Sequence, residues 1–260
     1  MYTLKNRIVF LTGASSGIGR ACARQFSAAG ARCILTARRG GRLDALAAEL
    51  EAEFGAESHV VEMDVTDENA VSEAVAGLPE AWREIDVLLN NAGKALGLAP
   101  SYEITSEHLH GMFDTNVKGV LYLTRAVVPG MIARNRGHVI HIGSTAGKWV
   151  YPGGTVYCAS KHAVKALNEG LKIDLHGTNV RVSTVDPGLV ETEFSIVRFE
   201  GDAERADAVY AHMTPLRPDD VADAVLYCAT RPAHVNISEI LLMCVDQSNA
   251  TLVHRSERTS

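Results

Sequence analysis

The fold is decided by residues 7–30, which read RIVFLTGASSGIGRACARQFSAAG. Residues 7–11 form an apolar run that predicts a short buried strand, and a glycine-rich turn, TGASSGIG, follows at residues 12–19. The turn opens an expected helix that ends at Gly30. Glycines allow a tight turn and a close backbone approach to a pyrophosphate, which the N–H groups at the helix start would bind. Ordinary strand-to-helix turns also contain glycine, but this one directly follows the first strand, which is the context that nucleotide binding requires.

The rest of the chain alternates between strands and helices. Six further apolar runs predict strands at residues 32–37, 59–65, 85–89, 138–142, 180–185 and 237–245. Helices are expected at residues 42–54, 67–76, 106–134, 155–171 and 219–230, with Pro129 as a kink or stop. Continuous apolar strands between helices are typical of a parallel sheet buried on both faces. We therefore expect one doubly wound, Rossmann-type α/β domain over residues 1–260, with a seven-stranded, mostly parallel sheet.

Composition narrows the class of protein. The 260 residues are 47% hydrophobic, and the formal net charge of −6 comes without a basic block, so a nucleic-acid partner is not expected. No apolar run reaches the roughly 18 residues of a membrane span, and the N-terminal residues lack the features of a signal peptide. The five cysteines are scattered and the ten histidines show no metal-ligand spacing. We expect a cytoplasmic protein with reduced thiols and no metal site.

Residues suited to ligand binding lie at the carboxyl ends of the expected strands, where open parallel sheets bind ligands. Asp64 and Val65 are placed to meet an adenine. Residues 90–93 (NNAG) offer amides that can tie neighbouring strands together and a glycine that admits a nucleotide. Turn chemistry alone accounts for both stretches equally well.

Two arginines follow the second expected strand. A cofactor with a free 2′-hydroxyl usually meets an acidic residue here, whereas this chain has none before Asp44. Arg38 and Arg39 suit a 2′-phosphate instead, because guanidinium groups form charge-assisted, bidentate bonds. A solvated basic turn is the alternative, but the preceding glycine-rich turn favours NADP(H) over NAD(H).

Residues 144–161, STAGKWVYPGGTVYCASK, carry groups suited to proton transfer. Tyr157 and Lys161 are four residues apart on an expected helix and share one face, and Ser144 follows an expected strand. A nearby ammonium is expected to lower the phenol pKa from about 10, which makes a general acid or base. A helix can also carry a Tyr and a Lys incidentally, so this pair alone is a weak pattern. Asn116, inside the long expected helix, needs a partner if buried, and a water connected to Lys161 would supply one.

TGxxxGxG, NNAG, a helical Asn, Ser, YxxxK and PG occur in an order that resembles the short-chain dehydrogenase/reductase family, over nearly the whole chain. The resemblance implies a catalytic tetrad. Tyr157 would be the acid–base, Ser144 would hold the substrate oxygen, Lys161 would bind the nicotinamide ribose, and Asn116 would anchor a relay water. It also places residues 187–192 around the nicotinamide. The full set of expected cofactor-binding residues is Gly13, Ser15, Ser16, Gly17, Ile18, Gly19, Arg38, Arg39, Asp64, Val65, Asn90, Asn91, Ala92, Gly93, Tyr157, Lys161, Pro187, Gly188, Val190 and Thr192.

Longer stretches, such as GHVIHIGSTAGKWVYPGG at residues 137–154, resemble the bacterial NADP-dependent serine/3-hydroxy acid dehydrogenases. The resemblance implies oxidation of serine, allo-threonine or short 3-hydroxy acids, or reduction of short anionic aldehydes. An anionic substrate needs a cation near the nicotinamide, and Arg198 lies in an irregular segment, residues 189–217, that is long enough to be a lid. Ser144, Tyr157 and Arg198 are therefore the expected substrate contacts. An exposed lid arginine is the alternative for Arg198, and Lys148 is a second candidate.

The sequence leaves alternatives open for the oligomeric state and for the activity of the protein. A stripe of small residues (Ala159, Ala163, Ala166 and Gly170) requires a close helix neighbour. Because the family packs this helix across a subunit interface, usually in tetramers, we expect a homotetramer. Whether the tail, residues 246–260, reaches a neighbouring subunit is open. A reductase of another small carbonyl, such as sulfoacetaldehyde or a diketone, is a second hypothesis. A third is a sensor that binds NADP(H) without turnover.

Overall fold

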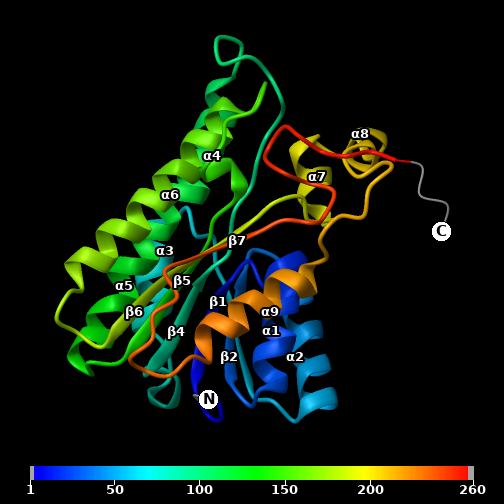
Figure 1. Cartoon of the computed structure of the whole chain (residues 1–260). Coiled ribbons are helices and arrows are strands. Elements are labelled where there is room, and N and C mark those ends of the chain that lie inside the picture. The colour runs from blue at the N-terminus through cyan, green and yellow to red at the C-terminus, as the bar shows by residue number, and fades with distance from the viewer. Residues whose placement is uncertain (1–2, 257–260) are drawn as a thin grey trace.

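The computed structural model describes residues 3–256, which form one sheet with helices on both faces (Figure 1). All seven strands are parallel, in the order β3-β2-β1-β4-β5-β6-β7, so the expected α/β fold is confirmed. The order reverses between β1 and β4, and such a reversal leaves a crevice for ligands. The strands are β1 (Ile8–Thr12), β2 (Arg32–Ala37), β3 (Ser58–Glu62), β4 (Ile85–Asn90), β5 (Gly137–Ile142), β6 (Val180–Pro187) and β7 (Glu239–Leu242).

The helices form two layers, seen to the right and left of the sheet in Figure 1. On one face α1 packs against α2 and α9, and on the other α3 packs against α5 while α6 packs against β6. These helices are α1 (Gly17–Ala28), α2 (Gly40–Phe54), α3 (Glu68–Ala76), α4 (Ser106–Phe113), α5 (Gly119–Ala133), α6 (Thr155–Asp174) and α9 (Pro218–Ala229). Two short helices, α7 (Glu193–Arg198) and α8 (Ala203–Ala208), lie in residues 189–217, and short 3₁₀ turns lie at Glu80–Trp82 and Thr145–Gly147.

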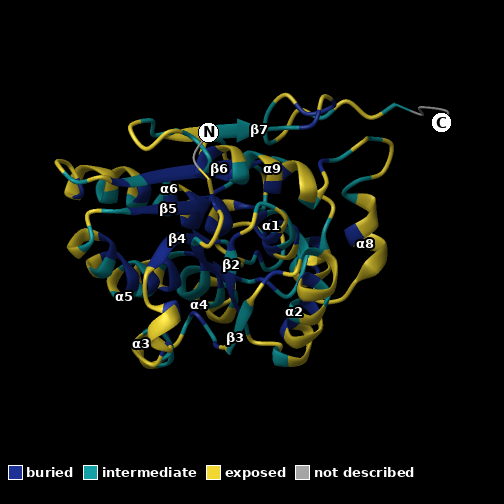
Figure 2. Cartoon of the chain, turned by 90° about the horizontal axis from the view of Figure 1, so that it is seen from below, coloured by how far each residue is buried: buried dark blue, intermediate teal, exposed yellow. Residues whose placement is uncertain are grey.

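The central strands are buried on both faces, as their continuous apolar runs predict (Figure 2, dark blue). Successive side chains of a strand point to opposite faces. Phe10 therefore belongs to the core under α3 and α5, whereas Leu11 belongs to the core under α1 and α2. Both side chains are fully buried. The sheet thus holds the strand ends rigidly between two cores. No helix within residues 3–256 has both the length and the apolar character needed to cross a membrane.

The long helix has two irregular features. A single π-helical turn, Asp114–Lys118, joins α4 to α5, and Pro129 lies inside α5, which continues to Ala133. Of the two alternatives for Pro129, a kink or a stop, the stop is excluded, and the expected end of the helix near Arg134 is confirmed. Pro129 is exposed, so the carbonyl that loses its hydrogen bond can face water instead. The π turn carries Asn116, and such turns are frequent at functional sites.

The C-terminal tail packs on the lid segment of its own chain (Figure 1, red). Gln247 Oε1 accepts a hydrogen bond of 2.9 Å from the Leu189 N–H. Arg255 donates to the carbonyls of Val209 and Ala211. These contacts tie the described part of the tail to residues 189–217, and residues 257–260 lie outside the described chain.

Candidate active site

A cleft of about 680 Å³ runs along the carboxyl edge of the sheet, beneath the lid segment. Most of the residues expected to bind ligands line it, although they come from widely separated parts of the chain. These are Gly13, Ser15, Ser16, Gly17, Ile18, Arg38, Arg39, Asp64, Val65, Asn91, Ala92, Gly93, Ser144, Tyr157, Lys161, Pro187, Gly188, Val190, Thr192 and Arg198.

The glycine-rich turn is shaped to hold an anion. Gly13 and Gly17 have φ values of +65° and +52°, a region that strongly favours glycine. A Cβ atom on Gly13 would lie 2.8 Å from Asn91 Nδ2, so no larger residue fits there without movement. Ser16 is the N-cap of α1, but its side chain does not cap the helix and no acidic residue lies in the first turn. The first N–H groups of α1 are thus available to a diphosphate.

Two expected cofactor contacts do not reach the cleft. A Cβ atom on Gly19 would lie 2.3 Å from the Gly13 carbonyl oxygen, so this glycine serves the packing of the helix on the turn. Asn90 is buried, and its Nδ2 lies 3.2 Å from His141 Nδ1, which ties β4 to β5. A direct contact of either residue with the cofactor stays a prediction. Asn91 ties β4 to β1 through a 2.8 Å bond to the Thr12 carbonyl, and it also lines the cleft.

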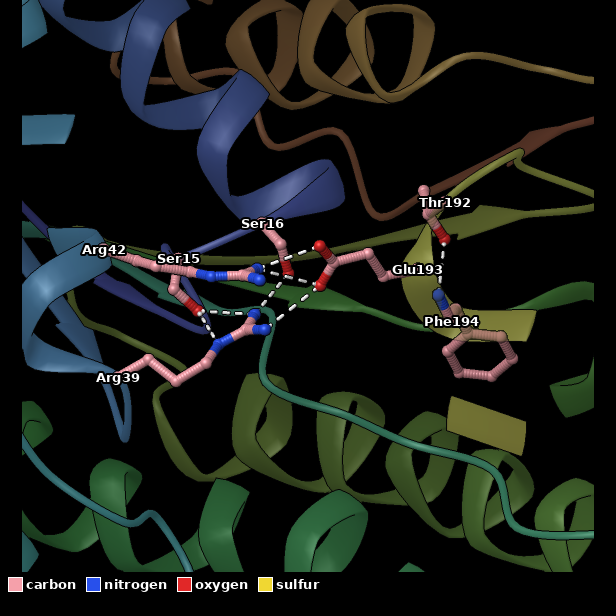
Figure 3. A network of polar contacts seen from close by, with 7 residues as sticks. All are labelled: Ser15, Ser16, Arg39, Arg42, Thr192, Glu193 and Phe194. Atoms are coloured by element: carbon pink, nitrogen blue, oxygen red, sulfur yellow. Dashed lines mark hydrogen bonds and ion pairs between the residues drawn. The ribbon is translucent and has the colours of Figure 1, made fainter. Parts of the chain in front are cut away.

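The two arginines after β2 have different surroundings. Arg38 is exposed, and its nearest anion is Asp64 at 3.9 Å. Arg39 donates to Ser15, Ser16 and the lid residue Glu193 (Figure 3). Arg42, which the sequence analysis did not single out, also binds the Glu193 carboxylate. The sequence does hold one indication of the role of Arg42. The helix dipole disfavours an arginine in the first turn of a helix, so an arginine there indicates an anionic partner.

The three residues that are expected to transfer the proton all line the cleft. Tyr157 is nearly buried, and its hydroxyl forms a hydrogen bond with the Ser144 side chain. Lys161 follows one turn later on α6, with Nζ 6.0 Å from the centroid of the Tyr157 ring. The sequence spacing therefore brings the hydroxyl, the phenol and the ammonium together as expected.

Burial and nearby groups shift the pKa values of Tyr157 and Lys161. Burial raises the pKa of Tyr157, and Arg198 and Ser144 oppose this change. Lys161 Nζ instead donates a 2.8 Å hydrogen bond to the Ile142 carbonyl. Burial lowers the pKa of Lys161 to about 8, and the nearby Asp186 carboxylate opposes this change. The lowering of the Tyr157 pKa by Lys161 stays a prediction.

Asn116 is buried and held by protein groups. Its Oδ1 accepts from the Lys94 N–H at 2.9 Å, and its Nδ2 donates to the Lys94 carbonyl at 2.8 Å and to Ser160 Oγ at 3.0 Å. Both amide protons are used, so a relay water would have to bind the second lone pair of Oδ1 or the main-chain carbonyl. A Cβ atom on Gly93 would lie 3.3 Å from Asn116 Oδ1 and 3.6 Å from Lys161 Nζ, which places Asn116 beside Lys161. The water itself stays a prediction.

Arg198 lies over the Tyr157 phenol. Its guanidinium carbon is 5.1 Å from the ring centroids of both Tyr157 and Phe194, and its Nη2 donates to the Tyr151 hydroxyl at 2.8 Å. Its Nε is buried without a hydrogen-bond partner among the described residues. Lys148 is exposed and does not line the cleft, so of the two candidates only Arg198 lies at the cleft. Tyr151 and Phe194 were not foreseen, because no local pattern marks them.

The family model for short chain dehydrogenases matches residues 7–203 of this chain. The chain belongs to the short-chain dehydrogenase family. It is 51% identical to the NADP-dependent 3-hydroxy acid dehydrogenase YdfG of Salmonella typhi, over 96% of this chain and 100% of that protein. It is 46% identical to sulfoacetaldehyde reductase 2 of Chromohalobacter salexigens, over 93% of this chain and 95% of that protein. The closed form of serine dehydrogenase complexed with NADP+ superposes with a TM-score of 0.89 at 48% identity, covering 96% of this chain and 100% of the other.

In this short-chain dehydrogenase, the turn after β6 packs directly against the C-terminal tail. A Cβ atom on Gly188 would lie 2.0 Å from Gln247 Oε1, so the tail approaches the strand end within van der Waals contact. The same Oε1 accepts from the Leu189 N–H, which lies at the start of the lid segment. The wall of the cleft after β6 is therefore fixed by the tail, although the sequence offered no local signal for this contact.

Proposed function

We propose that the chain is an oxidoreductase that transfers a hydride between NADP(H) and a short 3-hydroxy acid, a β-hydroxy amino acid or the corresponding semialdehyde. The observation that supports it most is the position of Arg198 over Tyr157, because it sets a cation for an anionic substrate beside the acid–base group. The three relatives named above support the same class of reaction.

The residues of the cleft fit a dinucleotide with a 2′-phosphate. The uncapped start of α1 suits the diphosphate, and the exposed guanidinium of Arg38 can approach a phosphate at the end of β2. Residues 187, 188, 189, 190 and 192 also line the cleft, as does Lys161. When bound there, the nicotinamide supplies or accepts the hydride.

The chain's own residues would then handle the proton. In the oxidative direction the Tyr157 oxygen takes the proton of the substrate hydroxyl, while Ser144 donates a hydrogen bond to the substrate oxygen. Lys161 would bind the ribose and favour the phenolate as its charge develops. Asn116 would hold a water that connects Lys161 to solvent. In the reductive direction the same groups act in reverse, with Tyr157 as the acid.

The substrate's charged group would bind Arg198. A guanidinium N–H that is buried without a partner is destabilising, and a carboxylate or sulfonate near Nε would satisfy it. The direct test is steady-state kinetics with serine, 3-hydroxypropionate, malonic semialdehyde and sulfoacetaldehyde, each with both nicotinamide cofactors. Turnover of at least one with NADP(H) in preference to NAD(H) supports the proposal. Binding of NADPH without turnover of any of them favours a sensor instead.

We also infer that the protein is a cytoplasmic homotetramer. In the single chain Leu121 and Ile132 of α5 and Ile173 of α6 remain exposed, and no atom lies within 4 Å of a Cβ built on Gly170. A second copy packed against α5 and α6 would cover these apolar side chains and the small-residue stripe. The five buried free thiols suit a reducing compartment. Light scattering at micromolar concentration should give the mass of four chains, and a monomer would contradict the assembly.

A further inference from the structure

The lid segment reaches across the cleft to the basic turn through one residue. Glu193, the first residue of α7, forms hydrogen bonds with Arg39 at 3.1 Å and with Arg42 at 2.9 and 3.1 Å. In Figure 3 both guanidinium groups point at this one carboxylate. The two arginines and Glu193 are more than 150 residues apart in the sequence, so the contact depends on the tertiary position of the lid.

Most N–H groups of the Arg39 guanidinium already donate hydrogen bonds. Its Nε and Nη2 donate to Ser15 Oγ at 3.3 and 3.0 Å, Nη2 also donates to Ser16 Oγ at 2.9 Å, and Nη1 donates to Glu193. A guanidinium has five N–H groups, and only one N–H of Nη1 is left here, so a phosphate that takes the whole Nη1 edge has to replace Glu193. The serine hydroxyls fix the orientation of that edge.

We propose that Glu193 senses the 2′-phosphate: its carboxylate occupies the anion position between Arg39 and Arg42, and an incoming 2′-phosphate displaces it. The proposal rests on the NADP(H) dependence of the proposed function. A 2′-phosphate carries nearly two negative charges and offers three acceptor oxygens, so it outcompetes a single carboxylate and repels it. A cofactor with a free 2′-hydroxyl brings no anion to this position and leaves Glu193 bound. Occupancy of the phosphate site is thereby coupled to release of the start of the lid.

Competition between the Glu193 carboxylate and a phosphate predicts that removing the carboxylate strengthens phosphate binding. The pKa of Glu193 is lowered by Arg42 and Arg39, so the carboxylate is ionised at neutral pH. Neutralising it removes the competitor without removing either arginine. Because solvent-exposed ion pairs are weak, the gain in affinity for a phosphate-bearing ligand should be about three- to tenfold. It should shrink at high salt, which screens exposed charges.

The experiment compares Glu193→Gln with the wild type by isothermal titration, using adenosine 2′,5′-bisphosphate and AMP as probes at low salt. The variant should bind the bisphosphate about three- to tenfold more tightly and bind AMP as the wild type does. Without ligand, trypsin should cleave the variant faster at Arg205, an exposed lid residue. Glu191→Gln is the matched control, because it removes the same charge from an exposed position two residues away that does not line the cleft.

The outcomes separate this inference from the proposed function. If the wild type binds neither the bisphosphate nor NADPH, the proposed function fails and this inference fails with it. If the wild type binds both and Glu193→Gln binds the bisphosphate equally, Glu193 does not compete. Weaker binding by the variant would show that carboxylate and phosphate bind together, which also overturns the inference.

Discussion

Two cations, Arg198 and Lys161, lie near the Tyr157 ring, and each interacts with a different group. Arg198 is above the ring and lowers the pKa of the phenol, partly offsetting the effect of burial. Lys161 donates to the Ile142 carbonyl and has the Asp186 carboxylate as its counter-charge. At the scale of single residues, Arg198 therefore acts on the phenol and Asp186 on the ammonium.

The first prediction concerns Arg198. Arg198→Met should weaken kcat/KM for 3-hydroxypropionate by about 10- to 100-fold, which corresponds to the loss of one charge-assisted hydrogen bond. A neutral alcohol of similar size should lose less, because only the acid uses the guanidinium. Lys148→Met, a cation outside the cleft, should change neither. Equal losses on the acid and the alcohol would rule out a selective anion contact.

The second prediction is a pH dependence. Asp186 has a pKa raised to about 6 by burial, so above this pH its carboxylate stabilises the Lys161 ammonium. Asp186→Asn removes that stabilisation, and the Lys161 pKa should fall below its value of about 8. The alkaline limb of the kcat/KM profile should then move to lower pH if the ammonium is required. An unchanged alkaline limb of the profile would disprove that Asp186 stabilises the Lys161 ammonium. The control is Asp174→Asn, because Asp174 is exposed at the end of α6.

At the scale of elements, two short irregularities place the chemistry. The π turn between α4 and α5 carries Asn116, whose amide holds the Lys94 backbone beside the cleft. The turn after β1 needs left-handed backbone at Gly13 and Gly17. The glycine pattern was readable from the sequence because its conformational requirement is local. The π turn was not, since it extends a helix by one residue without a distinct pattern.

The third prediction distinguishes the cost of left-handed backbone at a glycine from the cost of placing a side chain in the crowded turn after β1. Gly55, the C-cap of α2, has φ +62° with no atom within 4 Å of a built Cβ, whereas Gly13 has φ +65° and a close neighbour. Gly55→Ala should cost about 1 kcal/mol of unfolding free energy from left-handed backbone alone. Gly13→Ala should cost more and also weaken NADPH binding. Urea unfolding and NADPH titration measure both, and unchanged NADPH affinity in Gly13→Ala would contradict the account of the turn.

At the scale of the whole molecule, the sequence predicts the layers well and the contacts across the cleft poorly. Buried parallel strands are continuous apolar runs, so their number and order of appearance could be read directly. The choice between a kink and a stop at Pro129 stayed open in the sequence because it depends on the exposure of Pro129, which lets α5 continue. The pairing of Glu193 with Arg39 and Arg42 joins the lid to α2, and such long-range contacts depend on packing rather than on spacing.

The central claim is that the hydroxyl of Tyr157 moves the substrate proton, and Tyr157→Phe tests it most directly, since the change removes one oxygen and keeps the ring. With NADP+ and the best 3-hydroxy acid as substrates, kcat should fall by at least about a hundredfold. NADPH affinity should stay within about threefold, because Arg38 and the turn after β1 are untouched. A variant that keeps wild-type kcat would contradict the account.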